Sequence, residues 1–144
     1  MLRFQDVYIN LPVKDLQKSI HFFTAIGFEF NEVFTDDNGT CLVLGEHMYA
    51  MLLTHEFFKS FTNQDIADTE RENEVIMAFS AKNREEVDRI FNAALTAGAE
   101  DKTTPLPEMD DAMYYKRIKD LDGHLWEFSY MDMSKFNDPD VMIG

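Results

Sequence analysis

The 144-residue sequence contains a single cysteine, Cys41, so no disulfide can form within the chain. Cys41 lies in the apolar run 40–44, where we expect it to be a small core residue. No apolar run reaches the ~18 residues that a membrane-spanning helix needs. The first residues also lack the basic and apolar regions of a signal peptide. These absences predict a reduced, cytoplasmic protein that does not enter a membrane.

Positive charge is scarce as well. The chain has 13 Lys and Arg against 27 Asp and Glu, which gives a net charge of −14. Such a surface repels the phosphates of nucleic acids and the headgroups of anionic membranes, so we expect neither as a partner. The sequence has no glycine-rich phosphate loop, no CxxC and no GxSxG. What it does have is 45% hydrophobic residues, enough to bury a core.

The first half of the chain has a clear order of elements. Alternating apolar side chains from Val7 to Val13 predict a strand, with Tyr8 and Asn10 on its other face. Asp15 is a helix cap, and Gly27 ends the helix that follows. Three strand-like runs come next, at 28–34, 40–45 and 48–54.

The second half repeats this order. A strand at 75–81 precedes the helix cap Asn83, and Gly98 ends the second helix. Three strand-like runs again follow, at 99–103, 112–119 and 124–131. The repeat predicts an α+β fold of two βαβββ modules in a single domain. We place module one at about 4–54, a linker at 55–73, module two at about 74–131 and a tail at 132–144.

The linker 55–73 is long for a plain connection, and it carries Phe57, Phe58 and Phe61. It is either a surface loop whose aromatic side chains dock on the core or a lid over a cavity. The tail is expected to be loose unless a partner chain holds it.

Two segments, 11–23 and 120–128, together with the repeat, resemble the vicinal oxygen chelate superfamily. This superfamily includes glyoxalase I, bleomycin-resistance proteins, fosfomycin-resistance enzymes and extradiol dioxygenases. The resemblance covers about residues 4–131. It implies that the modules form curved mixed sheets that enclose one pocket, either within a chain or across a dimer.

In the metal-dependent members, the resemblance further implies a divalent ion held by His, Gln or Glu from four strand positions, two in each module. In this chain those positions fall on Tyr8, Ile76, about Leu52, and Glu127. Because only one of the four is a usual ligand, we expect no metal ion and no other cofactor. Glu127 and His55 are the remaining candidate ligands if a divalent ion does bind.

Glu127 is the candidate catalytic residue. Trp126 and Phe128 are expected under a helix, so Glu127 faces the other way, towards the pocket. A lone carboxylate there, held by Tyr8 or by a backbone amide, would serve as a proton acceptor or as the anchor for a cation. The candidate ligand-binding residues are Tyr8, Asn10, Leu52, Ile76, Tyr115 and Glu127. Tyr115 is named although either Tyr114 or Tyr115 could face the pocket.

Three functions remain open. The first is a metal-independent protein that binds a small cationic or aromatic molecule, as in the bleomycin-resistance branch. The second is a divalent-metal-dependent lyase or dioxygenase similar to glyoxalase I. The third is a structural or interaction protein whose pocket is filled by its own side chains. In each case we expect a homodimer, because open sheet edges are normally covered or paired.

Overall fold

The computed structural model describes residues 1–105 and 112–135 of the chain. The chain divides into two compact units, Met1–Glu72 and Asn73–Gly144, and each is described by itself. Most of the predicted tail, residues 136–144, lies outside the described residues. No helix in the described ranges combines the length and the apolar character that a membrane crossing needs.

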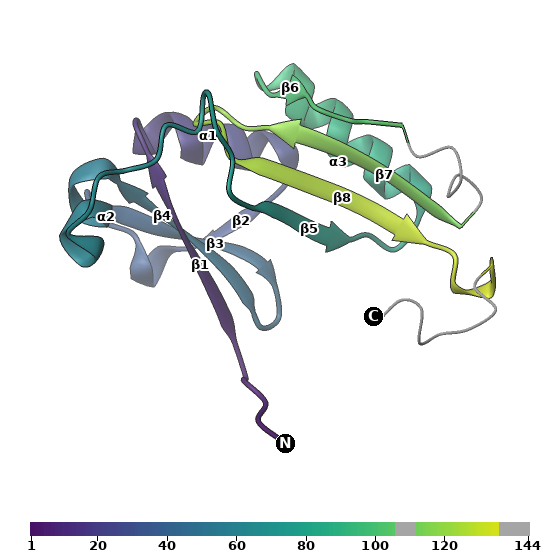
Figure 1. The fold of residues 1–144 in the computed structure, drawn as a ribbon, viewed down its shortest axis with the longest axis horizontal. Helices are drawn as coiled ribbons and strands as arrows, with labels where there is room; N and C mark the ends of the chain where they lie inside the picture. The colour runs from purple at the N-terminus through teal and green to yellow at the C-terminus, as the bar shows by residue number, and fades with distance from the viewer. Residues whose placement is uncertain (106–111, 136–144) are drawn as a thin grey trace. The chain divides into compact units, whose positions relative to one another are not determined.

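Unit one is a four-stranded mixed sheet with a helix on one face (Figure 1). Its elements are β1 (Val7–Val13), α1 (Leu16–Ile26), β2 (Glu29–Asn31), a 3-10 turn η1 (Glu32–Phe34), β3 (Gly39–Gly45), β4 (Met48–Thr54) and α2 (His55–Thr62). The strand order is β1-β4-β3-β2. Only β1 and β4 run parallel, and the other neighbours are antiparallel.

Unit two repeats this topology with the strand order β5-β8-β7-β6. Its elements are β5 (Ile76–Ser80), α3 (Arg84–Thr96), β6 (Glu100–Asp101), β7 (Met113–Lys119), β8 (Leu125–Met131) and a 3-10 turn η3 (Met133–Lys135). Strand β8 lies between β5 and β7, parallel to the first and antiparallel to the second (Figure 1). The predicted α+β fold of two βαβββ modules is confirmed.

Both main helices begin at the predicted caps. The Asp15 side chain accepts a hydrogen bond from the Lys18 backbone N–H at 3.1 Å, and Asn83 accepts one from the Glu86 N–H at 2.8 Å. Helix α1 ends at Gly27, whose φ of 119° is a left-handed conformation that glycine adopts without a Cβ penalty. Capping satisfies backbone donors that have no partner inside the helix, which fixes where each helix starts.

The buried side chains of each helix pack on one face of its sheet. In α1 they include Leu16, Phe22, Phe23 and Ile26, and in α3 Val87, Phe91 and Ala94. Under α3 lies Trp126, which is fully buried and stacks on Phe79 at 5.8 Å between ring centroids. Each fully buried large apolar side chain stabilises the fold by roughly 1.5–3 kcal/mol. The prediction that Trp126 and Phe128 lie under a helix is confirmed by their burial and by the pairing of β8.

The structure corrects the boundaries of three predicted elements. Residues 55–62 of the linker form helix α2, because the Thr54 hydroxyl caps the Phe57 N–H at 3.4 Å. The strand predicted at 28–34 stops at Asn31, whose side chain accepts from the Val33 N–H at 3.0 Å and turns the chain into η1. The strand predicted at 99–103 is only two residues long, and after it the Asp101 side chain accepts a hydrogen bond from the Thr103 N–H at 2.9 Å, which turns the chain.

Candidate functional site

The candidate site is the face of the unit-two sheet that points away from α3. Strand pairing aligns Ile76 with Leu125 and Ala78 with Glu127, so these four side chains share that face. Tyr115 and Arg117 of β7 lie on it too, opposite Ser129 and Glu127. We call this surface the Glu127 face; its members are Ile76, Ala78, Tyr115, Arg117, Leu125, Glu127 and Ser129.

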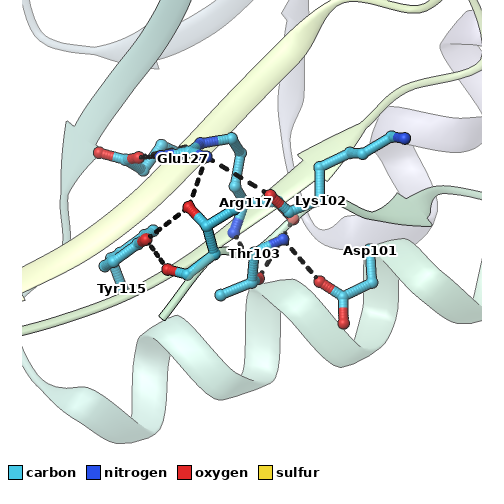
Figure 2. Close-up of polar contacts among 7 residues, drawn as sticks. Asp101, Lys102, Thr103, Tyr115, Arg117 and Glu127 are labelled. Atoms are coloured by element: carbon cyan, nitrogen blue, oxygen red, sulfur yellow. Dashed lines mark hydrogen bonds and ion pairs between the residues drawn. The ribbon is translucent and has the colours of Figure 1, made fainter. Parts of the chain in front are cut away.

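Arg117 and Glu127 form an ion pair at the centre of the Glu127 face. Nη2 of Arg117 donates to Oε1 of Glu127 at 2.6 Å, and Nε donates to the same oxygen at 3.1 Å (Figure 2). The two side chains are 17% and 13% exposed. Because both are largely removed from water, their charge-assisted hydrogen bonds are stronger than those of a surface pair.

The remaining donors of Arg117 hold the chain segment that follows β6. Nη1 donates to the Lys102 carbonyl at 3.4 Å and to the Thr104 hydroxyl at 3.3 Å. The guanidinium also lies over the Tyr115 ring, 5.3 Å from its centroid. The Tyr115 hydroxyl in turn donates to the Thr104 carbonyl. Arg117 is therefore held in place on several sides, and it holds Glu127 in one position.

A buried turn sets the register that brings Arg117 opposite Glu127. Oδ1 of Asp120 accepts from the backbone N–H groups of Asp122 and His124, both at 2.9 Å, while Oδ2 accepts from the Trp126 indole at 2.8 Å. Burial raises the pKa of Asp120, an effect that nearby His124 opposes. The Asp120 carboxyl thus organises the β7–β8 hairpin from inside the unit.

The expectation of a lone carboxylate at Glu127 is wrong, because Arg117 pairs with it. Sequence reasoning missed Arg117. The turn predicted at 120–123 would align residue 117 with residue 126, whereas the strands close on residues 120–124, which aligns residue 117 with residue 127. The expected hydrogen bond from Tyr8 to Glu127 would join the two units and stays a prediction.

In unit one, the three predicted ligand-binding residues Tyr8, Asn10 and Leu52 do not all lie on one face of the sheet. Tyr8 and Asn10 are aligned with Tyr49 and Met51, whereas Leu52 is aligned with Leu11 on the face beneath α1. Leu52 is only 1% exposed there. The expectation that Leu52 shares a face with Tyr8 is therefore wrong, and Met51 takes its place. The error is a one-residue slip, which moves a strand side chain to the opposite face.

Other candidates of unit one lie near its surface. Tyr8 is 56% exposed, and its ring stacks on Tyr49 with centroids 5.0 Å apart. Asn10 is exposed, and its side-chain amide donates to the Tyr8 carbonyl at 3.4 Å. His55 is the first residue of helix α2 rather than a loop residue.

These residues do not fit a divalent metal ion. The four strand positions carry Tyr8, Met51, Ile76 and Glu127, and the one carboxylate among them already binds a guanidinium. Hard divalent ions need several oxygen or nitrogen ligands at one point. Within residues 1–105 and 112–135, no three His, Cys, Asp or Glu side chains are grouped so that they could hold a metal ion.

Comparison with known proteins gives a consistent fold assignment. The model of the Glyoxalase/Bleomycin resistance protein/Dioxygenase superfamily matches residues 7–128. A hypothetical protein from S. aureus is 28% identical, with a TM-score of 0.74 over 89% of this chain and 94% of that one. Among curated proteins, none matches this chain.

Two further solved structures share the fold at lower identity. A glyoxalase/bleomycin resistance protein/dioxygenase family enzyme from Burkholderia phytofirmans is 16% identical, with a TM-score of 0.72 over 87% of this chain and 97% of that one. A mutant of the fosfomycin resistance protein FosX from Listeria monocytogenes, complexed with Mn(II) and a dihydroxypropylphosphonic acid, is 20% identical. Its TM-score is 0.65 over 93% of this chain and 94% of that one.

Proposed function

This chain belongs to the Glyoxalase/Bleomycin resistance protein/Dioxygenase superfamily, and we propose that it binds a small aromatic molecule on the Glu127 face without a metal ion. The observation that carries this proposal is the Arg117–Glu127 ion pair. The guanidinium already neutralises the negative charge of this carboxylate, which weakens its attraction for a second cation. The pair therefore supplies polarity and a fixed geometry where metal-dependent relatives would use an ion.

The chemistry of the face favours an aromatic ligand that carries a hydrogen-bond donor. Around the ion pair, Ile76, Ala78 and Leu125 offer apolar surface, and Ile76 is 50% exposed. Both hydrogen bonds from Arg117 go to Oε1 of Glu127, so Oε2 has no hydrogen-bond partner among the described residues. An apolar site with a few fixed polar groups is the usual form of a small-molecule site. Between the cationic and aromatic ligands expected from the sequence, the neutralised carboxylate favours the aromatic one.

The alternative of a metal-dependent lyase or dioxygenase is opposed by the donor set, since Tyr8, Met51 and Ile76 replace three usual ligands. The alternative of a structural protein predicts that no small molecule binds. A ligand-binding experiment separates it from the proposal.

The test measures the binding of indole and of 1-methylindole, either by calorimetry or from the rise in melting temperature that each ligand causes. Indole should bind the wild-type protein, and 1-methylindole, which lacks the N–H donor, should bind about tenfold more weakly because a hydrogen bond to a charged group is lost. Glu127→Gln turns the free acceptor into an amide donor and should abolish this discrimination. Glu85→Gln, an exposed residue in the first turn of α3 on the other side of the sheet, is the matched control. Equal binding of both probes would contradict the proposal.

We also propose a homodimer in the cytoplasm. Each sheet ends in two edge strands, β1 and β2 in unit one and β5 and β6 in unit two, and edges are normally covered or paired. A reducing compartment suits a chain whose only cysteine, Cys41, is 2% exposed.

A further inference from the structure

The turn that leads from η1 into β3 ends in the pair Asn38–Gly39, and Asn38 is the only one of the eight asparagines in the chain that a glycine follows. Asn38 is exposed, whereas Gly39 is buried. Packing favours glycine here, because a Cβ at position 39 would lie 2.7 Å from Cδ2 of Leu53 and 2.9 Å from the Leu52 carbonyl oxygen. The fold therefore places an asparagine next to a backbone nitrogen that is not shielded by a side chain of its own residue.

The peptide group that joins these two residues is hydrogen-bonded at both ends. Its N–H, which belongs to Gly39, donates to Oδ1 of Asp36 at 3.2 Å. Its carbonyl, which belongs to Asn38, accepts from the Thr54 N–H at 2.9 Å. The first bond brings a carboxylate to the proton on the nitrogen, and the second stabilises the negative charge that the carbonyl oxygen gains when this proton leaves. Both bonds therefore make the Gly39 nitrogen a better nucleophile.

We propose that Asn38 is a site of spontaneous deamidation in the folded protein, with Asp36 as the general base. The Gly39 nitrogen attacks Cγ of Asn38 and passes its proton to Asp36. The bond between this nitrogen and Cγ forms, the bond between Cγ and Nδ2 breaks, and the amide group leaves as ammonia with the proton from Asp36. The product is a cyclic succinimide, which water then opens to aspartate or isoaspartate at position 38.

Burial of Gly39 favours an internal base over hydroxide from the solvent. In an exposed peptide, hydroxide removes the amide proton, but it has little access to the N–H of a buried residue. The Asp36 carboxylate already contacts this proton, and the Asn38 N–H, which donates to the same oxygen at 2.8 Å, holds the carboxylate in place. The inference concerns unit one alone and does not rest on the function proposed for the Glu127 face.

Conversion to isoaspartate alters the connection between this turn and helix α2. It sends the backbone through Cβ and Cγ of residue 38 and turns the carbonyl that accepts from Thr54 into a free carboxylate. Thr54 is the N-cap of α2, so the modification removes a hydrogen bond at the residue where this helix begins. Deamidation at Asn38 therefore weakens the start of α2 as the protein ages.

The experiment follows deamidation of the full chain at pH 7 by peptide mass spectrometry, which assigns the modified asparagine. Asp36→Ser keeps a hydroxyl that can accept a backbone hydrogen bond but removes the base, so deamidation at Asn38 should slow at least about tenfold. Asp37→Ser removes the same charge from the neighbouring exposed residue and should change the rate less than twofold. Equal rates in the two variants, or a product formed mainly at other asparagines, would overturn the proposal.

The pH dependence of the wild-type rate separates a base from a purely structural role of Asp36. With this carboxylate as the base, the wild-type rate should rise less than about threefold from pH 6 to pH 7. The rate of Asp36→Ser, which depends on hydroxide, should rise about tenfold over the same interval. A tenfold rise in the wild-type protein would overturn the proposal, whatever the effect of the serine variant on the turn.

Discussion

The indole Nε1 of Trp126 donates to Oδ2 of Asp120 at 2.8 Å, and this buried hydrogen bond ties the core of unit two to the hairpin that carries its ion pair. Trp126 is fully buried and Asp120 is 8% exposed. The neighbour of Trp126 on the opposite face is Glu127. The contact that anchors the hairpin under α3 therefore also orients Glu127 towards Arg117.

Removing the Asp120 carboxyl should destabilise the fold. Asp120→Ala leaves the Trp126 indole and two backbone N–H groups without their acceptor inside the unit, at a cost of about 2–4 kcal/mol in the free energy of unfolding. Urea unfolding measures this directly. Asp36→Ala, an exposed turn residue whose side chain also accepts from backbone N–H groups, is the control and should cost less.

The same carboxyl should make stability depend on pH. Burial raises the pKa of Asp120, so the folded state favours the protonated form. That contribution to stability is complete below the ordinary pKa of an aspartate and is lost as pH rises through the raised pKa. Asp120→Asn lacks this contribution, so its stability deficit relative to wild type should be larger at pH 3 than at pH 7. A deficit that grows from pH 3 to pH 7 would contradict the raised pKa.

The ion pair should show strong coupling in a double-mutant cycle. Arg117→Met leaves the Glu127 carboxylate largely buried without its partner, and we expect it to lose about 1–3 kcal/mol of stability. The double variant Arg117→Met, Glu127→Leu should recover most of this loss, because two apolar side chains of similar volume replace the pair. Additive losses, measured by urea unfolding of all four proteins, would show that the two residues act independently.

Tyr114 should titrate at a higher pH than an ordinary tyrosine. Its hydroxyl donates to the Asp88 carboxylate of α3, and this bond together with burial raises the pKa of Tyr114 to about 12. The associated stability is present below pH 10.0 and is lost as pH rises through about 12. Absorbance at 295 nm should show a late tyrosine step that Tyr114→Phe removes. Loss of an earlier step instead would contradict the assignment.

The oligomeric state is measured by light scattering after gel filtration. The proposed homodimer predicts twice the chain mass of 16.8 kDa at micromolar concentration. A mass equal to one chain would contradict it.

The sequence predicted the elements because their signals are local. Asp15, Gly27 and Asn83 act through backbone groups only a few residues away, so the helix boundaries follow from neighbouring residues. The order of elements followed from the internal repeat. Helix α2 was missed because it is short and depends on the single cap Thr54.

The site was harder to predict because it depends on strand register. Strand alternation placed Glu127 opposite Trp126 correctly, but Leu52 was assigned to the wrong face by a slip of one residue. Arg117 was overlooked because it is ten positions from Glu127 in the sequence and meets it only through the hairpin. Pairing across strands requires the register of both strands, which alternation in one strand does not give.

The most direct test of metal-independent binding is an amide-detected NMR titration of the EDTA-treated, metal-free protein with indole. Saturable shifts at Ala78, Tyr115 and Glu127, unchanged when Mg²⁺ or Zn²⁺ is added afterwards, are the predicted result. Absence of any shift until a divalent ion is supplied would contradict the account, because the ion rather than the Arg117–Glu127 pair would then organise the site.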